Sequence, residues 1–351
     1  MDAQRQHALG PKNLLQYTEA DLKSRLSAIA ESRLAAAPIP PQRYGLSIVL
    51  RKAYPSVKAR ERTSVQDTLL AVRGAEPRTV AWDDVPADVL EFVRRRVVDD
   101  ALAAAHVLGA PSVQVVRVSG EKSLALEHLV APGACLTLFV DVQPNADVIL
   151  SEDHPFPSLR AQRSGPTGSY RVTRGTPRGL LRRSTPRNLR LRRSLTLAPR
   201  NDEYSSVLVL LHLGAGARVR WFGQSVHASG FTVIERLAML ARDAVLEHHS
   251  ALVASNAMRE NIHVVLREPG ATARVRTLFV GSADNQFDLG VTAEHRAPRT
   301  TSDLRAKGVL AGKAQAVVRG LVRVTQGAAG SDGYQRCDAL LLSPTAEVDP
   351  V

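Results

Sequence analysis

Three segments share one pattern: GARVRWFGQSV (Gly216–Val226), DAVLEHHSALV (Asp243–Val253) and GATARVRTLFV (Gly270–Val280). Each begins with a turn-forming residue followed by Ala and continues as a short strand-like run. Their first residues lie 27 positions apart, from 216 to 243 and from 243 to 270. A turn and strand that return at a fixed long period predict the stacked coils of a solenoid. A β-sandwich, whose strands usually recur every 8–12 residues, is the alternative fold.

The same small-residue pair recurs at Gly133-Ala134, Asn145-Ala146 and Lys313-Ala314. From Ser112 onward the chain consists of short apolar runs broken by Gly, Pro, Asn and Asp, which is typical of strands. Hydrophobic residues make up 44% of the chain and aromatics only 4%, so Val, Leu, Ile and Ala must fill the core. The clearest predicted strands are 113–118, 136–140, 207–211, 262–266, 275–280 and 317–324.

The N-terminal part, 1–110, reads as an α-rich region that precedes the β-rich core, 111–351. Apolar residues at helical spacing predict one helix over 11–37 and a second over 86–106. Pro86 suits the first turn of the second helix, and Gly109 suits its end.

The net charge of +12 comes from one tract within residues 154–200. Between Arg160 and Arg200 the chain has twelve arginines and no acid, together with many Pro, Ser, Thr and Gly residues. This composition predicts an unstructured insertion in the β-rich core. Three interpretations stay open: an RNA- or acid-binding tract, a solvated insertion, or out-of-frame sequence. The rest of the chain is close to neutral, which argues against nucleic acid as a partner of the folded body.

Several classes of protein are disfavoured by what the sequence lacks. No run of about eighteen apolar residues exists, which argues against a membrane span, and the first thirty residues lack a signal core. Cys135 and Cys337 lie too far apart for a four-thiolate site or a disulfide framework, so we expect a cytoplasmic protein. The sequence has no GxSxG, HExxH or P-loop motif, so it predicts neither a hydrolase nor an ATP site.

The C-terminal ninety residues resemble the SufB/SufD family of iron–sulfur cluster assembly scaffolds. His295–Ser302 is similar to its H-x-A-P-x-T-x-S element, and Lys307–Leu310 and Arg319–Val324 look like its K-G-V-L and R-G-L-V-x-V strands. Gln335–Leu342 resembles the SufB-type Q-x-C-D-x-L-L run, whereas Ser343–Asp349 looks like the SufD-type continuation.

This resemblance implies an all-β, right-handed parallel β-helix with a helical N-terminal part. It also implies a non-catalytic scaffold subunit that carries a transient iron–sulfur cluster. The implied partners are a SufC-like ABC-type ATPase, a SufB/SufD-type paralogue or second copy, and indirectly a cysteine desulfurase system, with no membrane. Reduced flavin is implied by the resemblance alone.

The chain departs from the family pattern at its end. Val351 comes before the Cys/His-containing motif and the ATPase-binding helices that the family carries further on. The resemblance therefore implies a chain truncated at its C-terminus. Because its motifs are mixed, the chain fits the SufB-like and the SufD-like type equally.

Cys337 is the first candidate site residue, because a thiolate binds iron and accepts sulfur. His295 and Glu294 are further candidate metal ligands, since imidazole and carboxylate also bind iron. An inert core thiol at Cys337 and a surface turn at His295 are the structural alternatives. The adjacent His248 and His249 should point to opposite faces of a strand. Cys135 is expected in the core and His263 on an outer face, while His212 and His227 show no supporting pattern.

Two other functions stay open. Parallel β-helices also host polysaccharide lyases and glycosidases, which would need acids and basic residues such as Asp284, Asp288 and Arg305 on one face. The arginine tract would serve an RNA-binding protein.

Overall fold

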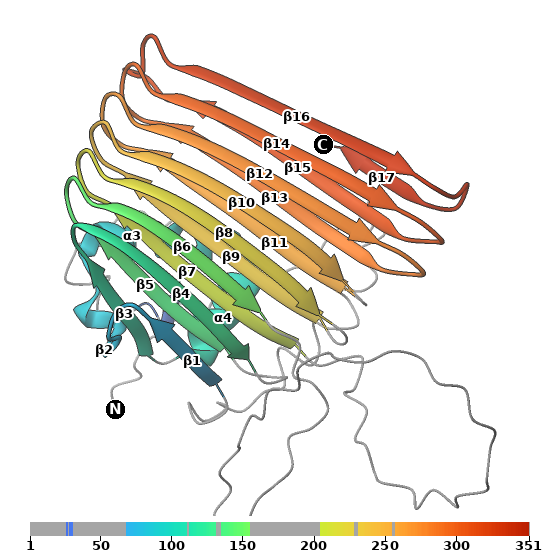
Figure 1. Ribbon diagram of the computed structural model, residues 1–351, viewed down its shortest axis with the longest axis horizontal. Coiled ribbons are helices and arrows are strands. Elements are labelled where there is room, and N and C mark those ends of the chain that lie inside the picture. The colour runs from blue at the N-terminus through green and yellow to red at the C-terminus, as the bar shows by residue number, and fades with distance from the viewer. Residues whose placement is uncertain are drawn as a thin grey trace, which may run out of the picture.

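The chain winds into a parallel β-solenoid built from two long sheets (Figure 1). The computed structural model describes residues 26, 28–30, 68–110, 112–130, 135–154, 204–227, 231–254 and 257–350. Along most of the solenoid, successive strands alternate between the sheets, so each coil gives one strand to each sheet. The predicted β-helix is confirmed, and the β-sandwich alternative is wrong.

The sheets are named A and B here. In sheet order, sheet A contains β1 (Thr68–Arg73), β4 (Glu121–Val130), β6 (Asp147–His154), β8 (Arg218–His227), β10 (Val245–Ala254), β12 (Thr272–Gly281), β14 (Thr301–Leu310) and β16 (Asp332–Leu341). Sheet B contains β2 (Arg78–Ala81), β3 (Ser112–Val118), β5 (Cys135–Val142), β7 (Tyr204–Leu213), β9 (Phe231–Leu240), β11 (Ala257–Leu266), β13 (Gln286–His295), β15 (Gln315–Val324) and β17 (Glu347–Pro350). The pairs β1–β4 and β2–β3 are antiparallel, and the other neighbours are parallel.

The register of sheet A reproduces the period seen in the sequence. Arg218 pairs with Val245 and Val245 with Thr272, so each coil repeats the spacing of the turn residues. The next coils are longer, because Thr272 pairs with Thr301 and Thr301 with Asp332. Asp147 pairs directly with Arg218. The two coils therefore stack on each other although the arginine tract, which lies outside the described residues, separates them in sequence.

At four of its recurrences the small-residue pair forms the turn that leads into a sheet A strand, namely β6, β8, β10 and β12, whereas Lys313-Ala314 precedes β15 of sheet B. In the four sheet A turns the first residue has a positive φ, at Asn145 (59°), Gly216 (68°), Asp243 (55°) and Gly270 (79°). Gly, Asn and Asp tolerate this backbone conformation better than other residues. The Ala that follows in each pair is buried, at residues 146, 217, 244 and 271. The sequence pattern therefore encodes one turn per coil, with the alanines in the interior.

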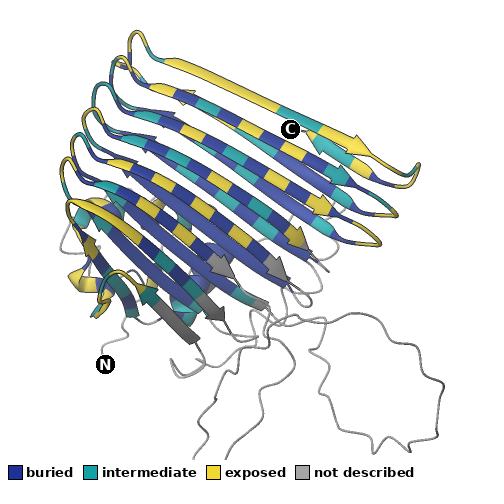
Figure 2. Cartoon of the chain, in the orientation of Figure 1, coloured by how far each residue is buried: buried dark blue, intermediate teal, exposed yellow. Residues whose placement is uncertain are grey.

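Alternate residues of the strands point inward, so buried and exposed positions alternate along sheet A (Figure 2), and most of the inward-facing side chains are apolar. Strand β12 shows this pattern clearly: Ala273, Val275 and Phe279 are buried, whereas Arg274 and Leu278 are exposed. All six strands named from the sequence are present within β3, β5, β7, β11, β12 and β15.

Two helices, α3 (Ala87–Asp99) and α4 (Ala101–Gly109), lie against the outer face of sheet B (Figure 1). The prediction of one helix over 86–106 is wrong, because the helix ends at Asp100. This residue has an extended backbone, and its carboxylate accepts a hydrogen bond from the Leu102 amide (2.9 Å), which caps α4. Of the helix predicted over 11–37, residues 26 and 28–30 are described, and they are helical. In the described residues no helix is long and apolar enough to cross a membrane.

Candidate functional site

Cys337 lies on β16 and points toward the solenoid interior. It lines a cavity of about 280 Å³ together with Leu304, Val318 and Gln335. It is half-buried and packs against the apolar cluster around Phe279. Its thiol is not part of a disulfide. Cys337 therefore combines features of an inert core thiol and of an accessible ligand, because it contacts the core and also lines a cavity.

The surroundings of Cys337 favour its neutral form. Burial raises the pKa of the Cys337 thiol, and the negative charge of neighbouring Asp338 raises it further. A thiol held in this way is a weak nucleophile at neutral pH. A cation beside it would reverse the effect by stabilising the thiolate.

His295 is buried at the end of β13, and both of its ring nitrogens are occupied. Nδ1 shares a hydrogen bond with Thr300 Oγ1 (2.7 Å), and Nε2 shares one with Ser302 Oγ (2.8 Å). Burial lowers the pKa of His295, although the charge of Asp332 opposes this. His295 therefore holds the 296–300 turn in place, and this turn belongs to the element that resembles the family motif.

Glu294 points to the opposite face of sheet B, as expected for neighbours on one strand. Arg296 donates a hydrogen bond to its carboxylate (3.0 Å). His263 Nε2 lies 3.7 Å from the same oxygen, too far for a hydrogen bond. His263 and Arg296 together hold the pKa of Glu294 at about 2. The negative charge of this carboxylate is therefore already balanced by Arg296, on the helix-covered side of the solenoid.

The three candidate ligands do not converge. His295 lies close to Gly333, whose added Cβ would be 3.5 Å from Nε2. Cys337 is four residues further along β16, about 13 Å away at 3.3 Å per residue. Among the residues that the structure describes, no three His, Cys, Asp or Glu side chains are grouped to hold a metal ion. The metal role of Cys337 stays a prediction.

A buried charged cluster in the solenoid interior was not predicted. Arg236 of β9 lies between Glu152 of β6 and Glu260 of β11, and all three side chains are buried. Arg236 Nε is 3.1 Å from Glu152 Oε2, which also accepts a hydrogen bond from Trp221 Nε1 (2.8 Å). Ser250 donates to Glu260 (3.2 Å). Burial raises the pKa of Glu260, although the positive charge of Arg236 acts to lower it.

The sequence contains one signal for this cluster. Glu235 and Arg236 stand in the middle of a strand whose other residues are nearly all apolar, and every residue of β9 is buried. Because neighbours on a strand alternate in direction, Arg236 enters the interior and Glu235 faces the helices. Arg96 of α3 donates a hydrogen bond to Glu235 (3.2 Å).

The remaining histidines named from the sequence and Cys135 lie in different surroundings. His248 is buried against Trp221 (4.6 Å between ring centroids) and His249 is exposed, so the prediction that they face opposite sides is confirmed. His263 lies on the outer face of sheet B, as expected, and there it packs against Phe92 of α3. His212 contacts Asp141 (3.0 Å). Cys135 begins β5 beside Gly109, which has no side chain to block the sulfur. The His227 side chain lies outside the described part.

The acids and basic residue named for a carbohydrate-active enzyme do not share a face. Asp284 is in an exposed turn, and Asp288 is buried on the outer side of sheet B beside Arg259 and Arg319. Arg305 is exposed on the outer face of sheet A. This arrangement does not supply the paired carboxylates of a glycosidase.

The chain is similar to known proteins over its C-terminal half. Residues 191–351 match the SufBD core domain of the SUF system of iron–sulfur cluster assembly. A protein of Mycobacterium tuberculosis described as an iron–sulfur cluster assembly SufBD family protein is 27% identical over 151 residues, which is 43% of this chain and 18% of that protein. The iron–sulfur cluster assembly protein SufD of Escherichia coli is 31% identical over 111 residues, 32% of this chain and 26% of SufD.

The match to the SufBD core domain falls on the coils of the solenoid. The matched region begins before β7 and includes every later strand, with Cys337 and the His295 turn. The similarity spans about a fifth to a quarter of the length of these relatives. The family suggested by the sequence motifs is therefore the family found by comparison: residues 191–351 match the core domain of the SufB/SufD family.

Proposed function

We propose that the chain is a scaffold subunit of iron–sulfur cluster assembly that catalyses no reaction itself. The observation that supports this most strongly is the match of residues 191–351 to the SufBD core domain, because it coincides with a continuous solenoid. Both relatives are described as iron–sulfur cluster assembly proteins. A solenoid suits scaffolding, because its stacked coils present long and regular surfaces.

In this proposal iron and sulfide are cargo, and Cys337 is the residue that first receives them. Its side chain lines a cavity at the last coils of the described solenoid and is not engaged in a disulfide. The raised pKa of the thiol keeps it neutral until a cation arrives. Because His295 and Glu294 are engaged elsewhere, the other ligands would come from the cargo or from a partner subunit. Free thiols suit a reducing compartment such as the cytoplasm.

The partner subunits proposed are a SufC-like ABC-type ATPase and a second SufB/SufD-type β-helix, with sulfur supplied by a cysteine desulfurase system. Strand β16 offers a surface for the second β-helix. Tyr334 and Leu340 are exposed on the outer face of sheet A along this strand. Exposed apolar side chains of this kind favour contact with a partner protein.

Co-expression tests the proposal. The chain would be expressed with a tagged SufC-like ATPase and a SufB/SufD-type paralogue, and the tagged protein would be purified at physiological salt. We expect the chain to co-purify with the paralogue in a fixed ratio. If the paralogue and the ATPase purify together without this chain, the scaffold proposal is wrong.

A further inference from the structure

The outer face of sheet A carries a groove of about 770 Å³ that the proposed function does not use. The helices α3 and α4 lie on the other sheet, so in the described structure they do not cover it. The groove is therefore open to a partner. Its outward-facing lining includes Phe222, His249, Arg276, Leu278, Arg305 and Lys307.

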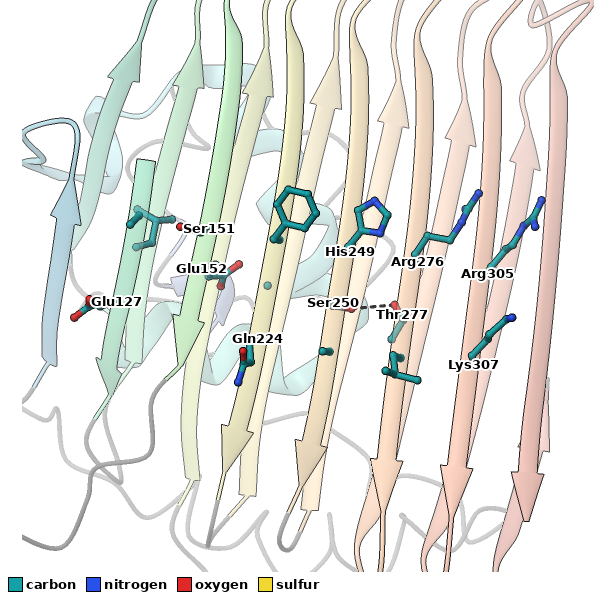
Figure 3. A pocket seen from close by; sticks show the side chains of 16 residues that line it. Glu127, Ser151, Glu152, Gln224, His249, Ser250, Arg276, Thr277, Arg305 and Lys307 are labelled. Atoms are coloured by element: carbon teal, nitrogen blue, oxygen red, sulfur yellow. Dashed lines mark hydrogen bonds between the residues drawn. The ribbon is translucent and has the colours of Figure 1, made fainter. Parts of the chain in front are cut away.

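Four of the lining residues form a row across the sheet. Phe222 of β8 is in register with His249 of β10, and Arg276 of β12 and Arg305 of β14 continue the row. Figure 3 shows His249, Arg276 and Arg305 side by side on adjacent strands. The rings of Phe222 and His249 are stacked, with centroids 5.3 Å apart, and Phe222 is 47% exposed. The row is therefore apolar at one end and cationic at the other.

A second row lies beside the first, two residues further along the strands, or about 6.6 Å away. It contains Ala251 of β10, Leu278 of β12 and Lys307 of β14, which are neighbours in register. Leu278 is 45% exposed, although it is a large apolar side chain. The second row therefore places an exposed apolar side chain next to the cations of both rows.

The cationic part of the groove has more positive than negative charge. Arg276 and Arg305 share one carboxylate, that of Asp303, with Arg305 Nε 2.9 Å from it. Lys307 lines the groove and forms no ion pair with any described residue. Three cations and one carboxylate leave two net positive charges beside the apolar side chains.

Two further acids near the groove are engaged elsewhere. Glu127, at the opposite end of the groove, pairs with Arg73 (3.3 Å). Asp338 is the neighbour of Lys307 on β16, and it pairs with Arg336 (2.9 Å). The positive charge of the groove therefore remains available to the acids of a partner.

The spacing of the rows suits a helix better than an extended segment. Neighbouring strands are about 4.8 Å apart, and side chains of one row repeat at this distance. On one face of an α-helix, side chains at i, i+3, i+4 and i+7 advance about 5.4 Å per turn. An extended segment repeats every about 6.6 Å on one face. Over three steps the mismatch is about 2 Å for a helix and about 5 Å for an extended segment.

We propose that this groove binds an acidic amphipathic helix of a partner protein, lying across the strands. Its Asp and Glu side chains face Arg276, Arg305 and Lys307, because guanidinium and ammonium groups bind carboxylates through charge-assisted hydrogen bonds. Its apolar stripe packs on Phe222 and Leu278, in the way that amphipathic helices commonly fill grooves. RNA fits less well, since its affinity depends on many phosphate contacts and the groove offers two net charges. Iron and sulfide take no part in this contact.

Fluorescence anisotropy with a synthetic peptide and the purified full chain tests the groove. The probe is a labelled Ala-based helix about five turns long, with Glu at successive i, i+4 positions and Leu on the adjacent stripe. One comparison peptide has Gln in place of every Glu, and another has the same composition in scrambled order. At physiological salt we expect the Glu peptide to bind at least about tenfold more tightly than either. This advantage should shrink as salt is added.

Matched variants test the residues. Arg276→Gln and Arg305→Gln should each remove most of the difference between the Glu and Gln peptides, while Leu278→Ser should weaken both. Arg274→Gln is the control with the same change in charge, because Arg274 is on the same strand and face but pairs with Glu247 (2.9 Å). Circular dichroism and thermal unfolding would show that each variant is folded.

Three results would overturn the proposal. The first is equal binding of the Glu peptide and either comparison peptide, or no binding of any. The second is an equal loss of binding in Arg274→Gln and Arg276→Gln, which would show a general effect of charge. The third is displacement of the Glu peptide by single-stranded RNA at a lower concentration than by unlabelled peptide, which would assign the groove to nucleic acid.

Discussion

Arg236 is the most completely buried charged residue of the described interior, and its two carboxylates lie on different strands of different sheets. Buried ions lose hydration worth several kcal/mol each, and only close partners offset this loss. Attraction to Glu152 and Glu260 outweighs the effect of burial and keeps the pKa of Arg236 above its ordinary value. The cluster therefore depends on all three members, and it fixes the position of β9 relative to β6 and β11.

Replacing Arg236 with Met should destabilise the protein by about 3–5 kcal/mol, because two buried carboxylates then lack a counter-charge. Urea unfolding at pH 7 measures this change. The loss should be smaller at pH 5, where the carboxylates can take up protons. Arg220→Met is the control: Arg220 pairs with Asp147 (3.1 Å) at the surface, and its loss should cost less than about 1 kcal/mol. Similar losses in both variants would contradict this account of the interior.

The Cys337 thiol should react slowly with iodoacetamide at pH 7 and faster as the pH rises past the ordinary thiol range, near 8.5. Burial and Asp338 both raise its pKa, so Asp338→Asn should move the midpoint of the pH–rate curve to lower pH. Mass spectrometry of the Cys337 peptide gives the rate. A midpoint that does not move in Asp338→Asn would show that the neighbouring charge is unimportant.

At the residue scale, the arrangement of the candidate site residues could not be predicted from the sequence. Glu294 and His295 are adjacent in the family-like motif, yet they point to opposite faces because they share a strand. The distance of about 13 Å between Cys337 and the His295 region follows from the register of β14 with β16. The sequence predicts strands but not this register, so the separation was not foreseeable.

At the element scale, α4 is connected to sheet B through a buried histidine. His106 shares hydrogen bonds with Ser206 of β7 (2.8 Å) and Thr137 of β5 (2.9 Å). Burial lowers the pKa of His106 to about 3. The imidazole is therefore neutral in the folded protein throughout the range in which an unfolded histidine takes up a proton.

This pKa shift makes the fold sensitive to acid. The contribution of His106 to stability is complete above pH 6.5 and is lost as the pH falls from 6.5 toward 3, at about 1.4 kcal/mol per pH unit. Burial also lowers the pKa of His248. We expect the free energy of unfolding to fall steadily from pH 6.5 to pH 4. In His106→Gln the dependence of the free energy of unfolding on pH should be smaller by one proton than in the wild-type protein. An unchanged slope in His106→Gln would exclude this coupling.

Asp100 explains why the predicted single helix is two. Its carboxylate caps α4 and also pairs with Arg259 of β11 and with Arg96 of α3 (3.5 Å). Helical spacing of apolar residues runs through this position, so the pattern alone predicts one helix. The cap and the ion pair with β11 end the helix at Asp100 despite that pattern. The ion pair joins residues far apart in sequence, so it cannot be predicted from the residues near Asp100 alone.

At the scale of the whole molecule, the regular period of the turn residues was the most informative feature of the sequence. It reflects one turn per coil, and the turn residues Gly216, Asp243 and Gly270 adopt the positive φ that Gly and Asp tolerate. The next coil uses Arg299 at the same kind of position, with φ of 55°. An arginine in the sequence does not predict a positive φ, so the repeat cannot be recognised from the sequence at this coil, although the turn itself is present.

The proposed pairing through β16 predicts the effect of one surface substitution. Leu340→Asp should abolish association with a paralogue or a second copy, because it places a charge on the apolar part of the strand, where Leu340 is 58% exposed. Val253→Asp is the control, since Val253 is also exposed on sheet A but lies on β10, away from β16. Light scattering after gel filtration measures the mass of each. Loss of association in both variants, or in neither, would place the interface elsewhere.

The proposed function has Cys337 as the residue that first receives iron and sulfide. The most direct test is anaerobic reconstitution with ferrous iron and sulfide, in the presence of the paralogue and ATPase, followed by visible absorbance and by metal and sulfide analysis after desalting. We expect the wild-type chain and Cys135→Ser to retain iron and sulfide with the absorbance of a cluster, whereas Cys337→Ser should not. Equal retention by Cys337→Ser, or no retention by the wild-type complex, would contradict it.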